Sequence, residues 1–179
     1  FMLPPAWTAG QPTGTLTDPA VNMSTVPEEM ISYLFIEEGQ SGSLVKGQDN
    51  TLTLTIHSVR DDTVFFSDRP ARISGLIDTG LFSTSSLWYE SNPPNAALML
   101  PDAPETNDTV ILTVSNPRYD KEKSTLVYSA ALVPDYHGEG LKAYLVFADP
   151  AIPEEFGKVI LFIDSAALPE NFPGTPFVN

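Results

Sequence analysis

Hydrophobic and polar residues alternate along the middle of the chain with a period of two. In residues 51–58, TLTLTIHS, the Leu and Ile side chains fall on one side of an extended segment, whereas the Thr side chains and His57 fall on the other. Residues 109–115, TVILTVS, repeat this pattern. Because successive side chains of a β-strand point to opposite faces, both segments are predicted to be strands with one buried and one solvent-facing side.

Other segments are rich in β-branched and aromatic residues, which fit a pleated surface and predict further strands. These segments are residues 31–37, 64–67, 96–100, 124–133, 142–148 and 158–164. Turn-forming sequences separate the strands at residues 46–50, 60–62, 116–123 and 135–140. This organisation predicts an all-β fold, an antiparallel β-sandwich (Ig-like or jelly-roll-like) of about eight strands.

One segment, residues 78–91, favours a short helix. Asp78 can cap its start, and apolar residues from Leu81 to Trp88 recur at roughly helical spacing. Gly80 and several Ser and Thr residues make it a poor helix former, so we expect a single short helix.

Both ends of the chain are rich in proline, which disfavours helices and strand ladders. We therefore expect an extended N-terminal arm at residues 1–30, a β-sandwich domain at 31–167 and a C-terminal arm at 168–179. Apolar residues in the arms are candidates for binding a protein partner. They are Phe1, Leu3, Trp7, Phe172 and Phe177.

Composition excludes several classes of function. The chain has 9 Lys and Arg against 23 Asp and Glu, a formal net charge of -14, so nucleic acid is not an expected partner. No apolar run approaches the roughly 20 residues of a membrane-spanning helix. Cysteine is absent and only two histidines are present, which leaves no thiol nucleophile and few histidine-based sites. We assign no catalytic residues and expect a protein that is not an enzyme.

The compartment is inferred from the acidity, the 17 prolines and a start on Phe1 instead of an initiator Met. Together these features favour an exported protein, in the extracellular space, the periplasm or an organelle lumen of the thylakoid type.

Three proline-containing segments at predicted strand ends form a candidate charged corner. They are residues 65–72, 91–98 and 115–120. The corner residues that can bind a ligand or hold the loops together are Asp68, Arg69, Arg72, Asn95, Arg118 and Tyr119.

Two interpretations of this corner stay open. The favoured one is a structural clamp that joins three loops, because the guanidinium fork of arginine matches a carboxylate or several carbonyl groups. In the other, Arg69, Arg72 and Arg118 line a pocket that binds a carboxylate or another anion.

The same segments carry a resemblance to a known family. They contain D-R-P at 68–70, P-P-N-A at 93–96 and N-P-R-Y-D at 116–120. In this order the elements resemble a family of uncharacterised, mostly exported bacterial and algal β-rich proteins. The resemblance covers residues 65–128 and implies a shared fold and a shared corner, but it transfers no activity.

Other polar and aromatic groups carry weaker signals. Adjacent acids such as Glu37 and Glu38 favour solvated charge, since neighbours on a strand point to opposite faces. Phe82, Trp88 and Tyr89 favour core packing over a platform for a sugar ring. No cofactor is expected, although calcium is possible at an oxygen-rich loop. Its candidate ligands are Asp102, Glu105 and Asp108.

These features favour a non-enzymatic, exported binding or structural module. In this interpretation, the protein is a peripheral subunit that docks on a larger protein assembly through its arms. The alternative is a domain that binds a small ligand or a carbohydrate through the arginine corner or Trp88. A hydrolase that uses scattered carboxylates comes third.

Overall fold

The computed structural model describes residues 31–48, 51–67, 71–89, 91–103, 109–138, 141, 153–165 and 175–178, the last range by its backbone alone. The strands of these residues form one antiparallel sheet in the order β11-β5-β4-β1-β10-β6-β7-β8-β3-β2-β9. Their bounds are β1 Tyr33–Gly39, β2 Ser41–Lys46, β3 Leu52–His57, β4 Asp62–Ser67, β5 Ile73–Asp78, β6 Asn95–Met99, β7 Thr109–Asp120, β8 Thr125–Leu132, β9 Glu155–Phe156, β10 Val159–Ser165 and β11 Thr175–Val178.

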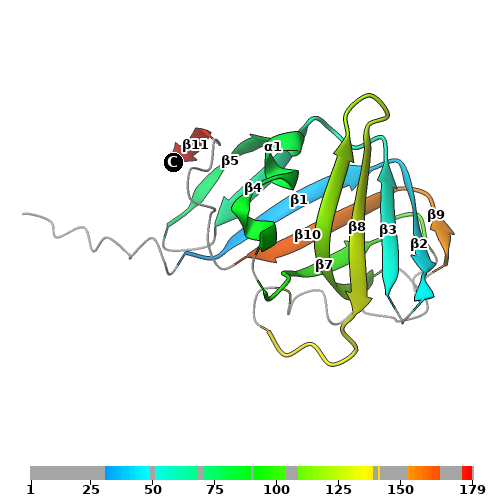
Figure 1. Ribbon diagram of the computed structural model, residues 1–179. Helices are drawn as coiled ribbons and strands as arrows, with labels where there is room; N and C mark the ends of the chain where they lie inside the picture. The colour runs from blue at the N-terminus through cyan, green and yellow to red at the C-terminus, as the bar shows by residue number, and fades with distance from the viewer. Residues whose placement is uncertain are drawn as a thin grey trace, which may run out of the picture.

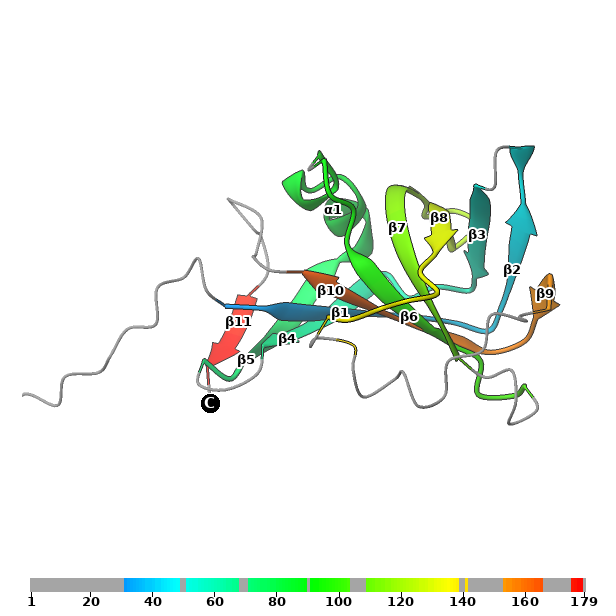
Figure 2. The same ribbon diagram turned by 90° about the horizontal axis from the view of Figure 1, so that it is seen from below.

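The sheet is strongly curved, so that its two halves stand as two layers. Strands β5, β4, β1, β10 and β6 form one layer, and β7, β8, β3 and β2 turn away from it (Figures 1 and 2). Strand β1 continues into β2 through Gln40, whose backbone N–H donates to the His57 carbonyl at 3.0 Å. One bent strand thus passes from layer to layer, which is a common way to build the corner of a sandwich. The predicted all-β, sandwich-like fold is confirmed.

The hydrophobic core lies between the two layers. Phe35 and Phe65 from one layer and Leu54 and Tyr128 from the other are fully buried. The ring of Phe35 stacks on Phe82 at a centroid distance of 4.7 Å. Burying a side chain of this size typically contributes about 1.5 to 3 kcal/mol, so these rings hold the layers together.

Strand β7 is longer than its sequence predicts. The sequence predicts a turn at residues 116–123, but residues 116–120 continue the strand to Asp120. The pairing of β7 with β8 shifts between Ser115 and Arg118, and Asn116 has a positive φ of 48°. A β-bulge with a left-handed Asn explains how a strand accommodates the Pro117 that follows.

Two strands, β2 and β5, lie in Gly- and Ser-containing segments that the alternation does not reveal. Gly42 in β2 has a clear packing reason, because a Cβ there would lie 2.6 Å from both Phe156 and the Thr55 carbonyl oxygen. At the other end of the sheet, β11 pairs with β5 and aligns Phe177 with Ser74. The last part of the predicted C-terminal arm is therefore an edge strand of the chain's own sheet.

The predicted helix is divided into two short helices, α1 at Thr79–Ser83 and the 3₁₀-helix η3 at Ser86–Tyr89. Asp78 caps α1 as expected, and its Oδ1 accepts from the Leu81 N–H at 3.0 Å. Both helices contact β7, and α1 also contacts β4 and β5. Within the described part of the chain, no helix is both long and apolar enough to cross a membrane.

Candidate ligand-binding site

The structure does not bring the described corner arginines together. Asp68 and Arg69 lie outside the described residues. Arg72 is exposed in the turn before β5, whereas α1 follows the opposite end of that strand. Arg118 lies on β7 beside α1 and shares a pocket with Ser83. The length of β5 therefore separates Arg72 from the surroundings of Arg118.

Asn95 and Tyr119 also take separate places. Asn95 opens β6 and pairs with Thr113, near the middle of β7. The Tyr119 hydroxyl donates to Asp61 Oδ1 at 2.7 Å, and burial, followed by this bond, raises the pKa of Tyr119 above its usual value. Lys121 Nζ also lies 3.7 Å from Asp61 Oδ2. Asp61 is therefore held by Tyr119 and a lysine, and not by one of the predicted arginines.

Arg118 has no ion pair or hydrogen bond with any residue that the structure describes. Its side chain is exposed on the outer face of the sheet, where it pairs in register with Val127. The acid two residues further on, Asp120, is bound to Lys123 at 3.1 Å. This arginine therefore lacks the partner that the clamp interpretation requires within the described chain.

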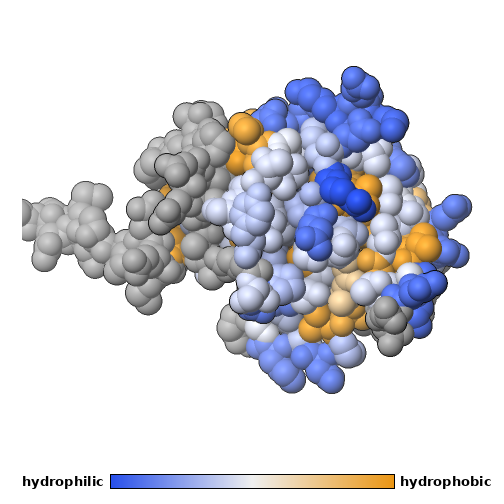
Figure 3. All heavy atoms as spheres, in the orientation of Figure 1, coloured by the Kyte–Doolittle hydropathy of each residue, from blue (hydrophilic) through white to orange (hydrophobic). Residues whose placement is uncertain are grey.

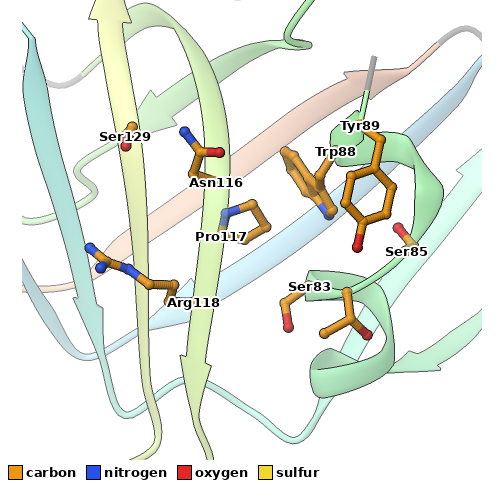
Figure 4. Close-up of a pocket in the computed structure, with 9 residues that line it drawn as sticks. Ser83, Ser85, Trp88, Tyr89, Asn116, Pro117, Arg118 and Ser129 are labelled. Atoms are coloured by element: carbon orange, nitrogen blue, oxygen red, sulfur yellow. The ribbon is translucent and has the colours of Figure 1, made fainter.

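An open pocket of about 550 Å³ lies beside Arg118, between the α1–η3 segment and the outer edge of β7 (Figure 4). Trp88 and Pro117 face each other across it, and Arg118 lies beyond Pro117. The lining residues are Ser83, Thr84, Ser85, Trp88, Tyr89, Asn116, Pro117, Arg118 and Ser129. The pocket thus combines two aromatic rings with one cation and several hydroxyl groups.

The aromatic wall is held by the core beneath it. The half-buried Trp88 packs edge-on against Phe82 at 5.4 Å and near Tyr128 at 5.5 Å. Its indole N–H donates to the Phe82 carbonyl at 2.8 Å, so only the ring surface is free to contact a ligand. Tyr89 is 80% exposed beside it. Core packing is thus confirmed for Phe82, holds in part for Trp88 and does not hold for Tyr89.

Polar groups of the pocket differ in whether the protein already satisfies them. Ser83 Oγ donates to the Gly80 carbonyl at 2.8 Å, and Thr84 Oγ1 donates to the same carbonyl at 3.1 Å. By contrast, Ser85 Oγ is buried without a hydrogen-bond partner in the described structure. Because this oxygen is buried, the exposed Arg118 guanidinium is the group of the two that can offer hydrogen bonds to a ligand.

A buried polar chain supports the start of α1. Glu37 on β1 is 1% exposed, and Thr63 Oγ1 contacts Glu37 Oε1 at 2.6 Å. Thr63 Oγ1 lies 3.1 Å from Thr79 Oγ1, which donates to the Arg60 carbonyl at 2.9 Å. Burial raises the pKa of Glu37 to about 8, and the Thr63 contact opposes this effect only in part. The prediction that the side chain of Glu37 is a solvated charge is therefore wrong, whereas Glu38 is exposed.

The surface around the pocket is of mixed polarity. Over β7, β8 and β3 it combines areas of intermediate hydropathy with hydrophobic areas, and a small strongly hydrophilic group lies near the centre (Figure 3). Asn116 and Arg118 are exposed on β7, and Ser129 is exposed on β8. A polar ligand can therefore approach the pocket along this face.

The calcium candidate is only partly described. Asp102 is exposed, and Glu105 and Asp108 lie outside the described residues. Among the residues that are described, no three or more His, Cys, Asp or Glu side chains cluster as metal ligands.

No protein-family model, curated protein or solved structure matches the chain. The resemblance carried by the D-R-P, P-P-N-A and N-P-R-Y-D elements therefore stays a prediction.

The sequence indicates the aromatic pair Trp88 and Tyr89 and the corner segment 115–120, but not that they share a pocket. It does not indicate the hydroxyl residues of the lining, because Ser83 to Ser85 only predict a weak helix and Ser129 lies on a predicted strand. Glu37 could have been found, because it follows the buried Tyr33 and Phe35 at a spacing of two. The pocket forms because α1 and η3 pack on β7, and no pattern in the sequence predicts this contact.

Proposed function

We propose that the protein is a non-enzymatic binding module whose pocket between η3 and β7 holds a carbohydrate. The observation that carries this proposal is the wall formed by Trp88 and Tyr89 opposite polar groups of β7. Ligand pockets typically combine apolar and aromatic surface with a few polar groups that orient the ligand. The C–H face of a sugar ring can pack on an aromatic ring while its hydroxyl groups bond to the polar rim.

The described residues favour binding over catalysis at this site. No Asp, Glu or His is among the described residues that line the pocket, so these side chains include none of the usual general acids or bases. Glycoside hydrolysis usually needs two such carboxyl groups beside the scissile bond. The proposed role is therefore retention of a glycan.

Binding to an array of neutral and acidic oligosaccharides, followed by calorimetry on the best binder, tests the proposal. Tyr89→Ala and Trp88→Phe should each weaken binding, by about fivefold or more, because both reduce or reshape the aromatic surface. Leu81→Ala is the matched control, since Leu81 is 51% exposed on α1 but does not line the pocket. Absence of any glycan binding, or binding that both aromatic variants leave unchanged, contradicts the proposal.

Docking on a larger assembly through the arms stays a separate prediction. Phe1, Leu3, Trp7 and Phe172 lie outside the described residues, and only the backbone of Phe177 is described. Export to an extracellular, periplasmic or lumenal compartment is likewise a prediction, and it is compatible with either role.

A further inference from the structure

Arg118 differs from the other described basic residues by its place in the pocket. Acidic residues outnumber basic ones by 23 to 9, yet only two lysines of the described chain form ion pairs. The two lysines that follow on the chain do pair with acids, Lys121 with Asp61 and Lys123 with Asp120. Arg118 makes no ion pair with a described residue although it lines the pocket.

The position of Arg118 follows from the bulge in β7. The register shift between Ser115 and Arg118 places Asn116, Pro117 and Arg118 together along the pocket. Pro117 faces Trp88, and the Arg118 side chain extends on the far side of Pro117 (Figure 4). The guanidinium group points away from Trp88, so it can meet a ligand only where the ligand extends past Pro117, as the second ring of a disaccharide held against Trp88 would.

We propose that the sugar bound in this pocket carries a carboxylate, which pairs with the guanidinium group of Arg118. This inference rests on the carbohydrate-binding function proposed above and names the class of sugar, a uronic acid. The planar donor fork of arginine matches a carboxylate with two parallel hydrogen bonds. The exposed Asn116 amide and Ser129 hydroxyl lie in the same lining and provide further donors.

The surrounding charge limits how acidic this ligand is. A net charge of -14 repels polyanions at long range, whereas a short-range pair with one arginine is much less affected. A saccharide with a single uronic acid gains the local pair with little of the long-range repulsion. A uniformly charged polyuronate is therefore the poorer ligand, especially at low salt.

The experiment compares two disaccharides that differ only at one carbon, cellobiose and its form with a terminal glucuronic acid, together with a 6-sulfated analogue. Calorimetry is done on wild type, Arg118→Gln and Arg72→Gln at the same ionic strength. Arg72→Gln is the matched control, because it makes the same charge change at an exposed arginine that does not line the pocket. Wild type and Arg72→Gln should bind the uronate about tenfold more tightly than cellobiose, and Arg118→Gln should lose this preference.

The outcomes separate the inference from the proposed function. Equal binding of cellobiose and the uronate by wild type, or a preference that survives in Arg118→Gln, overturns the carboxylate and leaves the sugar site intact. Tighter binding of the sulfated analogue also overturns it, in favour of a sulfated sugar. If wild type binds none of the three sugars and no glycan on the array, the carbohydrate function itself fails and this inference fails with it.

Discussion

Glu37 and Arg118 are both ionisable side chains of the sheet, yet the fold treats them in opposite ways. Glu37 lies on the inner face of β1, almost completely buried, with Thr63 as its hydrogen-bond partner. Arg118 lies on the outer face of β7, exposed and without a partner in the described structure. The first side chain belongs to the interior of the protein, whereas the second is available to another molecule.

The difference shows how a charged residue can be assigned to folding or to binding. A buried carboxyl group is stable only if it stays neutral or is fully paired, so its surroundings must be built around it. An exposed arginine has no such requirement, because water satisfies its donors. Replacing Glu37 should therefore change stability, whereas replacing Arg118 should change binding alone.

The largest expected effect concerns the pH dependence of stability. The pKa of Glu37 rises from 4.5 in the unfolded chain to about 8 in the fold, so the folded state holds one more proton between these values. The contribution of this group is complete below pH 4.5 and is lost as pH rises to about 8, at about 1.4 kcal/mol per pH unit. Urea unfolding at pH 5 to 9 should show Glu37→Gln more stable than wild type at pH 8.

Glu38→Gln is the control for this prediction, since Glu38 is the exposed neighbour on the same strand. It should leave the pH dependence of the free energy of unfolding unchanged. A Glu37→Gln curve parallel to that of wild type would contradict a neutral, buried Glu37.

The next effect concerns the hydroxyl chain above Glu37. If Glu37 is ionised, Thr63 donates its hydroxyl proton to Glu37 and can only accept from Thr79. The single hydroxyl proton of Thr79 would then have to serve both Thr63 Oγ1 and the Arg60 carbonyl oxygen. A protonated Glu37 can donate instead, and each contact then has its own proton. Thr79→Val should therefore cost about 1 to 3 kcal/mol in the free energy of unfolding, because it strands buried polar groups. Thr53→Val, on the exposed face of β3, should change it by less than about 0.5 kcal/mol; equal effects of the two variants would refute this role of Thr79.

A smaller effect is expected at the start of α1, which carries one wall of the pocket. Asp78→Ala removes the acceptor of the Leu81 N–H and should cost about 1 kcal/mol in thermal or urea unfolding. Asp78→Asn keeps an acceptor oxygen but removes the charge near Lys121. Recovery of most of the lost stability in Asp78→Asn supports the cap, and a loss as large as that of Asp78→Ala attributes it to the ion pair.

The sequence predicts the strands best where apolar residues alternate without interruption. The faces of β3 agree with the pattern, since Leu54 and Ile56 are buried and His57 is exposed. In β7 the predicted inner face is buried, but the predicted solvent-facing side is wrong, because Thr109 and Ile111 are buried too. Ile111 packs in a second cluster with Ala97 and Tyr136, which the alternation does not reveal. The alternation fails for β2 and β5, where glycine and serine occupy positions that packing of neighbouring strands decides. It also fails at Asn116, because a bulge and a turn require the same kind of residue.

The candidate site is less predictable, because it depends on contacts between distant segments. The sequence suggests one group of Arg69, Arg72 and Arg118, because each lies near a proline at a predicted strand end. The length of β5 separates Arg72 from Arg118, since Arg72 precedes this strand and α1, which lies beside Arg118, follows it. Trp88 reaches the pocket because α1 and η3 pack on β7, which is again a tertiary contact.

The smallest expected effect on stability is that of Arg118, and it gives the sharpest contrast with Glu37. A structural clamp at this position would cost roughly 2 to 4 kcal/mol on truncation, because a buried partner would lose its counter-charge. Arg118 is exposed and has no described partner, so Arg118→Gln should change the free energy of unfolding by less than about 0.5 kcal/mol. Arg72→Gln should behave alike, since Arg72 is also exposed. A loss of 2 kcal/mol or more in Arg118→Gln alone, measured by urea unfolding at pH 7, would restore the clamp and assign Arg118 to the fold.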